Sequence, residues 1–493
     1  MSHLNVAEEI FRPKLLIDGA WIEKDTKFDV IDPGTENVWA QVSTATVDDV
    51  EAAVAAAEKA FATYSQIPGR ERGKMILKWD ELIRKYKPDI ARLISLETGK
   101  PFHESIAELD YALTFTWWMA GEAERQHGST MEGALPGNRF VVIKKPIGVV
   151  ACLMPWNFPV ALACRKIATA LAAGCTVVAK PSPETPLSTL AVAHLLELAG
   201  FPPGVVNVLP TDNANTPPIG EALCRHPVVQ KVSFTGSTAV GKLLASQCAG
   251  TLKKLTLELG GNGAFIVFPD SDLEKAATWL MACKFRNAGQ VCVTAQRVFV
   301  HSSVLDEFAD LMKGKIEALK QGPAFEEGVT LGPVTTKRSV EKIHRHVQNA
   351  VSNGATVITG GSPNTSLKGF FFQPTLLKGM TDTMTISCEE TFGPVVALYS
   401  FETEKEVVER ANNTSMGLTS YLFTKDADRI WRIMEKLEVG NVGINTGMTT
   451  SAEAPFGGWH DSGYGKEAGK EYGISEYLKI KSATWKVDFE GSS

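Results

Sequence analysis

The sequence predicts an α/β protein with two doubly wound α/β domains and a small β unit for oligomerisation. Three observations lead to this fold class. From about residue 147, short β-branched runs alternate with helical patterns, as in a parallel sheet covered on both faces. A second alternating series starts with AFIVF at 264–268. Two outlying stretches, 138–145 and 475–487, alternate apolar and polar residues, as exposed strands do.

The first series indicates a doubly wound sheet of the nucleotide-binding type. It predicts strands at 147–154, 175–181, 205–210, 229–236 and 254–259, with helices between them at 161–174, at 185–200, around Gly220–Cys224 and from Ser237.

The second series predicts a second α/β domain. RVFVHSS and SYLFTK read as strands, and DEFADLMKGKIEALK reads as a helix between them. Long strands with exposed edges are usually paired. We therefore expect the outlying stretches at 138–145 and 475–487 to join an oligomer interface.

Composition argues against several classes of function. The 493 residues are 44% hydrophobic and 22% charged, which is ordinary for a globular protein with a large core. The formal net charge of −6 argues against a nucleic-acid surface. Eight scattered cysteines without a CxxC pair fit free thiols in a reducing compartment. The N-terminal residues show no apolar signal core, so the predicted location is the cytoplasm.

Neither a membrane nor a metal is an expected partner. Residues 146–164 carry no charge over 19 positions, which is the length of a membrane span. Pro155 and Pro159 would break a helix in that span. His344 and His346 form an HxH, but residues two apart on a helix point away from each other. We interpret them as surface histidines.

Cys292 is a candidate nucleophile. A long helical pattern, from about Asp272 to Asn287, runs into Gly289, and the cysteine follows. Two interpretations are open. A free cysteine is most often a buried structural thiol, and in the right surroundings its thiolate is a nucleophile.

Polar residues also follow two predicted strands. Glu258, in LTLELGGNG, is either a strand-end carboxylate facing water or a general base whose pKa desolvation raises. Asn157, in MPWNFP, either caps the next helix or donates to an oxyanion. The turn in SFTGSTAVGK, at 233–242, suits a pyrophosphate, although it is not a GxGxxG fingerprint.

Seven motifs occur together and in order: MPWNFP, KPSPETP, FTGSTAVG, LELGGNG, FRNAGQVC, EETFGPV, and APFGG followed by SGYGKE. This set resembles the aldehyde dehydrogenase superfamily over almost the whole chain, and MPWNFP, FRNAGQ and VGINTG most resemble the succinate-semialdehyde dehydrogenases. The resemblance implies a homodimer or homotetramer with three parts per subunit. These are an NAD(P)-binding domain at 1–126 and 148–259, a catalytic domain at 260–460, and oligomerisation strands at 127–147 and 470–493.

The same resemblance implies oxidation of an aldehyde to an acid through a thiohemiacetal and a thioester on Cys292. Asn157 and the backbone N–H of Cys292 would hold the oxyanion, Glu258 would activate water, and Glu467 and Lys166 would relay protons. The residues implied for the NADP or NAD site are Trp156, Lys180, Ser182, Pro183, Gly236, Ser237, Gly241, Leu259, Glu390 and Phe392.

For the substrate, the resemblance implies succinate semialdehyde. Arg165 and Arg286 match arginines that hold its distal carboxylate, a task that suits a guanidinium fork. Pairing with acidic side chains is the alternative. Thr450 and Ser451 would also contact that carboxylate. Thr450 stands where relatives carry Ser, and its additional methyl group bears on the preferred chain length.

Two positions depart from the family pattern. Thr294 replaces a cysteine that pairs with the nucleophile in some relatives, so no such disulfide is predicted. Pro183 stands where NAD-preferring relatives carry Glu, and the acid comes one residue later, at Glu184. A 2′-phosphate near Lys180 is then not repelled, which favours NADP slightly over NAD.

Three alternatives stay open at this point. The substrate could be glutarate semialdehyde or another small aldehyde. CoA-acylating chemistry is a second alternative, and Glu258 argues against it because such members tend to lack the base. The third is a non-catalytic paralogue that acts as a binding or structural module.

Overall fold

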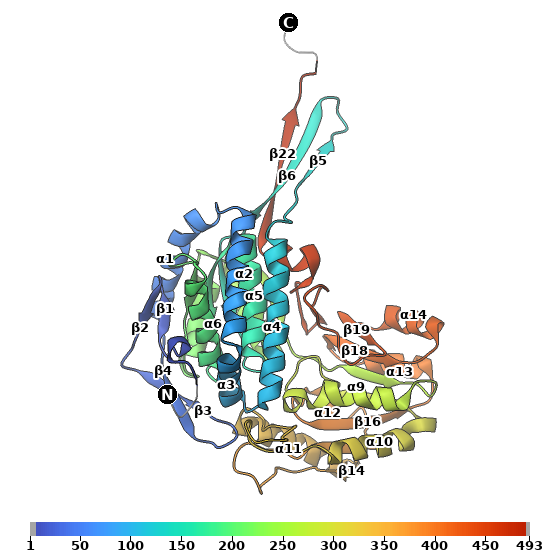
Figure 1. The fold of residues 1–493 in the computed structure, drawn as a ribbon. Helices are drawn as coiled ribbons and strands as arrows, with labels where there is room; N and C mark the ends of the chain where they lie inside the picture. Colours follow the sequence, from blue (N-terminus) through green and yellow to red (C-terminus); the bar gives the residue numbers. More distant parts are fainter. Residues whose placement is uncertain (1–5, 490–493) are drawn as a thin grey trace.

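A computed structural model describes residues 6–489, which form two lobes and a projecting arm (Figure 1). The sheet of the first lobe has eight strands: β1 (Leu15–Ile17), β2 (Ala20–Ile22), β7 (Val149–Leu153), β8 (Thr176–Lys180), β9 (Val206–Val208), β10 (Val229–Thr235), β11 (Lys254–Glu258) and β21 (Gly463–Tyr464). Their order is β2-β1-β9-β8-β7-β10-β11-β21. The five central strands are parallel, and β1 and β21 join them antiparallel.

Helices cover both faces of this sheet, and β7 shows the alternation. Val150 and Cys152 belong to the core under α2 (Gly69–Lys85), α3 (Lys87–Thr98), α4 (Phe102–Glu122), α5 (Pro159–Ala173) and α6 (Pro186–Leu198). Val149, Ala151 and Leu153 belong to the opposite core, under α1 (Val47–Tyr64), α7 (Thr216–Arg225) and α8 (Thr238–Cys248). Burial on both faces explains why these strands are apolar throughout.

The second lobe repeats this plan with a seven-stranded sheet. Its order is β14 (Thr356–Thr359), β15 (Thr375–Lys378), β16 (Val395–Phe401), β13 (Arg297–His301), β12 (Ala264–Val267), β18 (Thr419–Phe423) and β19 (Asn441–Ile444). Only β14 is antiparallel to its neighbour among these strands. The helices are α9 (Leu273–Phe285), α10 (Leu305–Glu317), α11 (Lys337–Ser352), α12 (Thr385–Cys388), α13 (Glu404–Asn412) and α14 (Ala427–Lys436).

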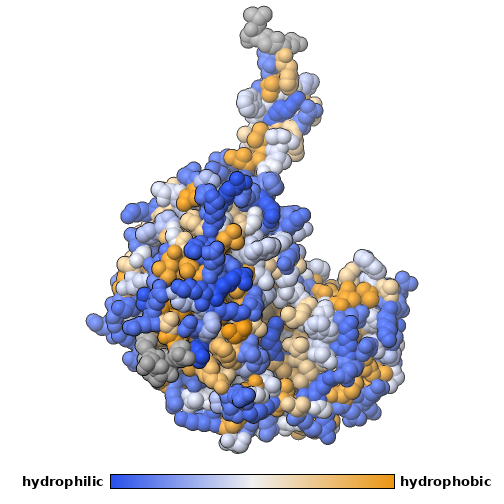
Figure 2. Space-filling view, in the orientation of Figure 1, coloured by the Kyte–Doolittle hydropathy of each residue, from blue (hydrophilic) through white to orange (hydrophobic). Residues whose placement is uncertain are grey.

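The arm is a separate antiparallel sheet of β22 (Leu478–Lys486), β6 (Asn138–Pro146) and β5 (Ser129–Glu132). β6 and β22 are the two outlying strands predicted from alternation, and they pair along their full length, from Leu478 with Pro146 to Lys486 with Asn138. The arm extends away from both lobes (Figure 1), and apolar side chains lie on its surface (Figure 2).

Short elements complete the chain: β3 (Lys27–Ile31), β4 (Val38–Ser43), β17 (Met416–Gly417), β20 (Trp459–His460), and the single turns η1 (Glu8–Ile10), η2 (Ala249–Thr251), η3 (Arg286–Gly289), η4 (Ser302–Val304) and η5 (Gly469–Gly473). Within residues 6–489, no helix has the length and apolar character needed to cross a bilayer. The predicted α/β fold class is confirmed. The domain boundaries stay a prediction, and their residues 1–5 and 490–493 lie outside the described part of the chain.

Candidate active site

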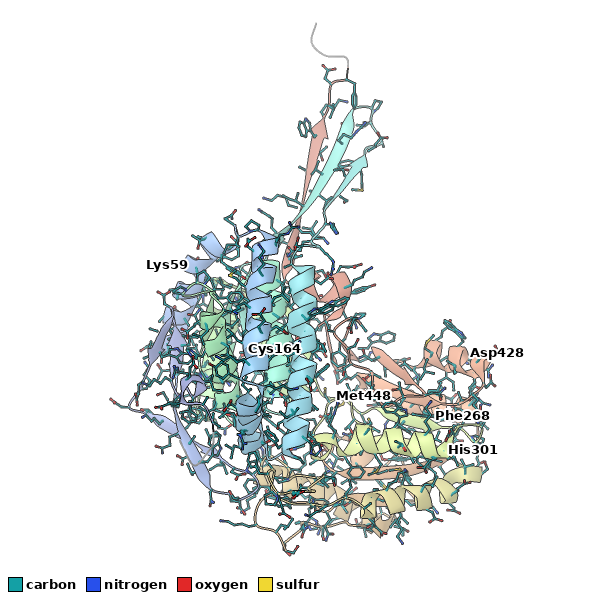
Figure 3. All side chains as sticks on the ribbon, in the orientation of Figure 1. Lys59, Cys164, Phe268, His301, Asp428 and Met448 are labelled. Atoms are coloured by element: carbon teal, nitrogen blue, oxygen red, sulfur yellow. The ribbon has the colours of Figure 1, made fainter. Side chains whose placement is uncertain are left out.

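The carboxyl ends of β7, β10 and β11 open onto the boundary between the lobes, where ligands bind in open α/β sheets. A cavity of about 340 Å³ lies there. The first lobe lines it with Trp156, Asn157, Gly236, Ser237, Glu258 and Leu259, and the second with Cys292, Arg338, Lys342, Glu390 and Phe392. Figure 3 shows Met448 at the same boundary.

The loop that carries Cys292 leaves its helix earlier than predicted. α9 ends at Phe285, not near Asn287, because Asn287 and Ala288 take left-handed φ angles of 50° and 52°. Glu104 accepts a hydrogen bond from the Asn287 N–H at 2.8 Å. Gly289 is required here, since a Cβ would lie 2.2 Å from the carbonyl oxygen of Gly393. The turn brings half-buried Cys292 to the cavity.

The Cys292 thiol needs a base. Burial, then the charges of Glu390 and Glu258, raises its pKa to about 12. Glu258 ends β11 and lines the same cavity. A Cβ on Gly261 would lie 2.4 Å from the Cys292 carbonyl oxygen, so this glycine of LELGGNG lets the two loops approach.

Glu258 is a buried carboxylate, and neither of its oxygens has a hydrogen-bond partner among the described residues. Desolvation, followed by the charge of Glu467, raises its pKa well above the ordinary value. A carboxylate in this state is basic enough to take a proton near neutral pH. The open alternative of a strand-end carboxylate facing water is wrong.

Asn157 follows β7 and its side chain points at the loop of Cys292. Its Nδ2 donates to the carbonyl oxygen of Gln290 at 3.0 Å. The N-cap position of α5 is Phe158 and not Asn157, and the Asn157 side chain does not cap that helix. The amide is therefore placed beside the cysteine, as an oxyanion donor requires.

Glu467 and Lys166 form a buried pair behind Glu258. They are in direct contact, and Ser233 accepts from the Lys166 ammonium at 3.0 Å and donates to Glu467 at 2.9 Å. Burial opposes the ionisation of Glu467, but the charges of Lys166 and Arg165 outweigh it and lower its pKa.

The two predicted substrate arginines differ in their partners. Arg165 is buried, donates to the Tyr111 hydroxyl at 2.5 Å and lies 3.7 Å from Glu467, which is the acidic pairing named as the alternative. Arg286 is half-buried and forms no ion pair with the described residues. Its guanidinium stacks over Phe158 at 5.3 Å and reaches Met448 Sδ at 3.9 Å.

Thr450 and Ser451 lie in the loop after β19 and are half-buried. The Ser451 hydroxyl accepts from the Ala454 N–H at 3.3 Å. Neither residue lines the 340 Å³ cavity, and neither do the two arginines.

Six of the ten residues predicted for the cofactor line the cavity: Trp156, Gly236, Ser237, Leu259, Glu390 and Phe392. The rings of Trp156 and Phe392 meet at right angles, 5.5 Å apart. Glu390 accepts from the Gly261 N–H at 3.3 Å, and burial raises its pKa to about 7.

The other four lie outside it: Lys180, Ser182, Pro183 and Gly241. Gly241 packs on Leu259, since a Cβ there would lie 2.4 Å from that side chain. Lys180 donates to the Pro181 carbonyl oxygen at 3.0 Å, and burial lowers its pKa to about 8. The Ser182 hydroxyl donates to Glu184.

The part of the cavity that Gly236, Ser237 and Glu390 line fits a nicotinamide dinucleotide. The turn from β10 into α8 presents backbone N–H groups beside Gly236, as a pyrophosphate requires. A carboxylate such as Glu390 suits ribose hydroxyls. The sequence analysis missed the cations of the site, Arg338 and Lys342, which stand four apart on α11. That spacing places two positive charges on one helix face, but no strand end or motif marked it.

The interpretation of His346 as a surface residue is wrong. It is buried, with Nδ1 3.1 Å from the Thr391 hydroxyl and Nε2 3.4 Å from Glu389. Helical spacing turns it inward while His344 is half-buried. No cluster of metal-ligating side chains occurs within the described ranges.

Comparisons with known proteins agree with this geometry. A family model described as "Aldehyde dehydrogenase family" matches residues 21–483. "Succinate-semialdehyde dehydrogenase [NADP(+)] 1" of Schizosaccharomyces pombe is 47% identical over 97% of this chain and 95% of its own. "Glutarate-semialdehyde dehydrogenase" of Pseudomonas aeruginosa is 42% identical over 96% and 97%. A crystal structure of succinate-semialdehyde dehydrogenase from Burkholderia pseudomallei superposes with a TM-score of 0.95, at 43% identity over 98% and 99%.

Proposed function

The chain belongs to the aldehyde dehydrogenase family, and from this premise we propose that it oxidises succinate semialdehyde to succinate through a covalent intermediate on Cys292. It is an NAD(P)-dependent aldehyde dehydrogenase. The observation that carries the proposed mechanism is the convergence of Cys292, Glu258 and Asn157, from three separate segments of the chain, on one cavity.

The first step is attack by the thiolate. Glu258 takes the thiol proton, and the sulfur of Cys292 bonds to the aldehyde carbon to give a thiohemiacetal. The carbonyl oxygen becomes an oxyanion, which accepts hydrogen bonds from the Asn157 amide and the backbone N–H of Cys292. Glu258 supports this role because its carboxylate has no competing partner among the described residues.

NADP or NAD, when bound, accepts the hydride that leaves the former aldehyde carbon. Gly236 and Ser237 would face its pyrophosphate, and Glu390, Phe392 and Trp156 would hold the nicotinamide end. The proposed cofactor site also includes Lys180, Ser182 and Pro183. Gly241 and Leu259 belong to it as well and pack against each other. Ser182 engages the Glu184 carboxylate, which supports tolerance of a 2′-phosphate and a preference for NADP.

The last step is hydrolysis of the thioester. Glu258 deprotonates a water molecule, which attacks the acyl carbon and releases the acid and the Cys292 thiolate. Before this step, Glu467 and Lys166 carry away the proton that Glu258 took from the thiol, and after it they carry away the proton that Glu258 took from water. Their direct contact and their shared partner Ser233 support a relay.

The distal carboxylate of the substrate is the proposed ligand of Arg286 and Arg165, with Thr450 and Ser451 nearby. Arg286 supports it most, since a half-buried guanidinium without an ion pair is available for an anion. Glutarate semialdehyde is the second candidate, because a relative with that named activity is 42% identical over 96% of this chain.

We also propose a homodimer or homotetramer built through the arm. Ile480 is 73% and Trp485 66% exposed on β22, whose outer edge is unpaired in the described residues. Exposed strand edges favour pairing with another chain. Replacement of both side chains by Asp should lower the mass measured by sedimentation, and an unchanged mass would contradict this interface.

The proposed location is the cytoplasm. All eight cysteines carry free thiols, which supports a reducing compartment. Cell fractionation tests this directly.

The decisive experiment is kcat/KM for succinate semialdehyde, glutarate semialdehyde and butanal, each with NADP and NAD. We expect the order succinate semialdehyde, glutarate semialdehyde, butanal, and a higher value with NADP. Preference for butanal would remove the carboxylate-binding role of the arginines. No oxidation of any of the three would overturn the proposed substrate class.

A further inference from the structure

A buried ion pair outside the cavity holds the backbone of Asn157. Lys100 lies between α3 and α4 and Glu108 lies in α4. Their side chains are 1% and 0% exposed, and their charged atoms are 2.6 Å apart. No motif in the sequence marks either residue, and neither lines the cavity.

Both partners bind the segment that carries Asn157. The Lys100 ammonium donates to the Asn157 carbonyl oxygen at 2.8 Å and lies 4.3 Å from the centre of the Phe158 ring. Glu108 accepts from the N–H groups of Val160 and Ala161 at 2.9 and 3.2 Å, in the first turn of α5. The pair therefore holds the peptide group before Phe158 and the two peptide groups that follow Pro159.

The second lobe also forms hydrogen bonds with Asn157. The Asn287 side chain donates to the Asn157 carbonyl oxygen at 3.0 Å, and the Asn157 amide donates to the Gln290 carbonyl oxygen at 3.0 Å. Glu104, four residues after Lys100, accepts from the Asn287 N–H. One stretch of the first lobe thus fixes Asn157 and also the loop that presents Cys292.

Stability alone is a weak reason for this pair. Desolvation of two charges offsets their attraction, and apolar residues of similar size are often equally stabilising. The hydrogen-bond geometry of the Lys100–Glu108 pair explains its presence better. Three donors on one ammonium allow Lys100 to bind Glu108 and the Asn157 carbonyl together, and fixing that peptide fixes the direction of the Asn157 side chain.

We propose that Lys100 and Glu108 are positioning residues, which aim the Asn157 amide at the oxyanion that forms on Cys292. This inference rests on the proposed function, because it acts through Asn157. It predicts a loss in the rate of hydride transfer without a loss in binding, since neither residue contacts substrate or cofactor.

The test is the single-turnover rate of NADPH formation with saturating succinate semialdehyde, together with KM and the Kd for NADP. We expect K100M to slow hydride transfer about 10- to 100-fold, as a displacement of about 1 Å does, with KM and Kd changed less than about twofold. K100M leaves Glu108 buried without its cation, so K100M/E108Q is measured beside it. The matched control is Asp80→Asn, which removes the charge of a buried carboxylate on α2 that pairs with the exposed Arg84 and does not touch Asn157.

A double-mutant cycle decides between positioning and general destabilisation. Asn157→Ala alone should slow hydride transfer about 10²- to 10³-fold, and K100M should cost less than about threefold more in that background. The same loss from K100M in both backgrounds, or an equal loss from Asp80→Asn, would overturn the inference and leave the proposed function standing. A wild-type rate in Asn157→Ala would instead overturn the proposed oxyanion role itself.

Discussion

The regions around Glu258 and Glu467 contain the same side chain at the same depth in opposite surroundings. Glu258 is 3% exposed and has no hydrogen-bond partner within residues 6–489, whereas Glu467, also 3% exposed, contacts Lys166 and Ser233. Burial raises the pKa of the first, and neighbouring cations lower that of the second. Such a separation of pKa values suits Glu258 to its proposed role as the base and keeps Glu467 ionised at rest.

The arginines repeat this contrast. Arg165 lies 3.7 Å from Glu467 and has the Tyr111 hydroxyl as a second partner. Among the described residues, Arg286 contacts the Met448 sulfur and the Phe158 ring, and its charge acts on the Glu104 carboxylate without forming an ion pair. In both pairs, the residue with fewer protein partners is the one available to the reaction.

The largest effect should come from replacing Cys292, the proposed nucleophile. Cys292→Ala should lower turnover about 10⁴-fold or more, because no thioester can form, while the Kd for NADP, measured by fluorescence titration, stays unchanged. Substantial residual turnover would mean that Glu258 and Glu467 serve another nucleophile.

The second-largest effect should come from replacing Glu258, the proposed general base. Glu258→Gln should slow deacylation about 10²- to 10⁴-fold, and hydride transfer less. Stopped-flow absorbance should then show a burst of about one NADPH per active site before a slow steady state. A uniform loss without a burst would put the role of Glu258 before the thioester.

The contrast between the arginines predicts a smaller and more selective effect. Arg286→Ala should raise KM for succinate semialdehyde about 10- to 100-fold, the equivalent of the 1.5–3 kcal/mol of a hydrogen bond to a charged group. KM for butanal, which lacks the carboxylate, serves as the control and should not change. Equal increases for both aldehydes would make Arg286 structural.

The smallest effect should come from Glu467, the carboxylate that is ionised at rest. The charge of Glu467 raises the pKa of Glu258, so Glu467→Gln lowers that pKa. A general base works deprotonated and is lost as pH falls through its pKa. The acid limb of kcat should therefore move to lower pH, with kcat on the plateau within about tenfold of wild type. A limb moved to higher pH would contradict the electrostatic coupling.

Much of the site could be predicted because its signals are local. Glu258 and Asn157 each follow an apolar strand, and strand ends of a parallel sheet meet at one edge. Gly289 and Gly261 appear in motifs next to Cys292 and Glu258, where the backbones come too close for a Cβ. Arg338, Lys342 and Lys100 carry no such signal, because the residues of the site that lie near each of them are distant along the chain.

The sequence by itself determined the element types and the two-lobed plan, since β-branched runs and helical periodicity depend on near neighbours. It also marked the reactive residue types. Only the tertiary structure decided their charge states. Lys166 and Glu467 are 301 positions apart, yet they touch, and their charges act on Glu258, which has no hydrogen-bond partner in the described part of the chain. Burial and the nearest charge set a pKa, and both are properties of packing that no local pattern contains.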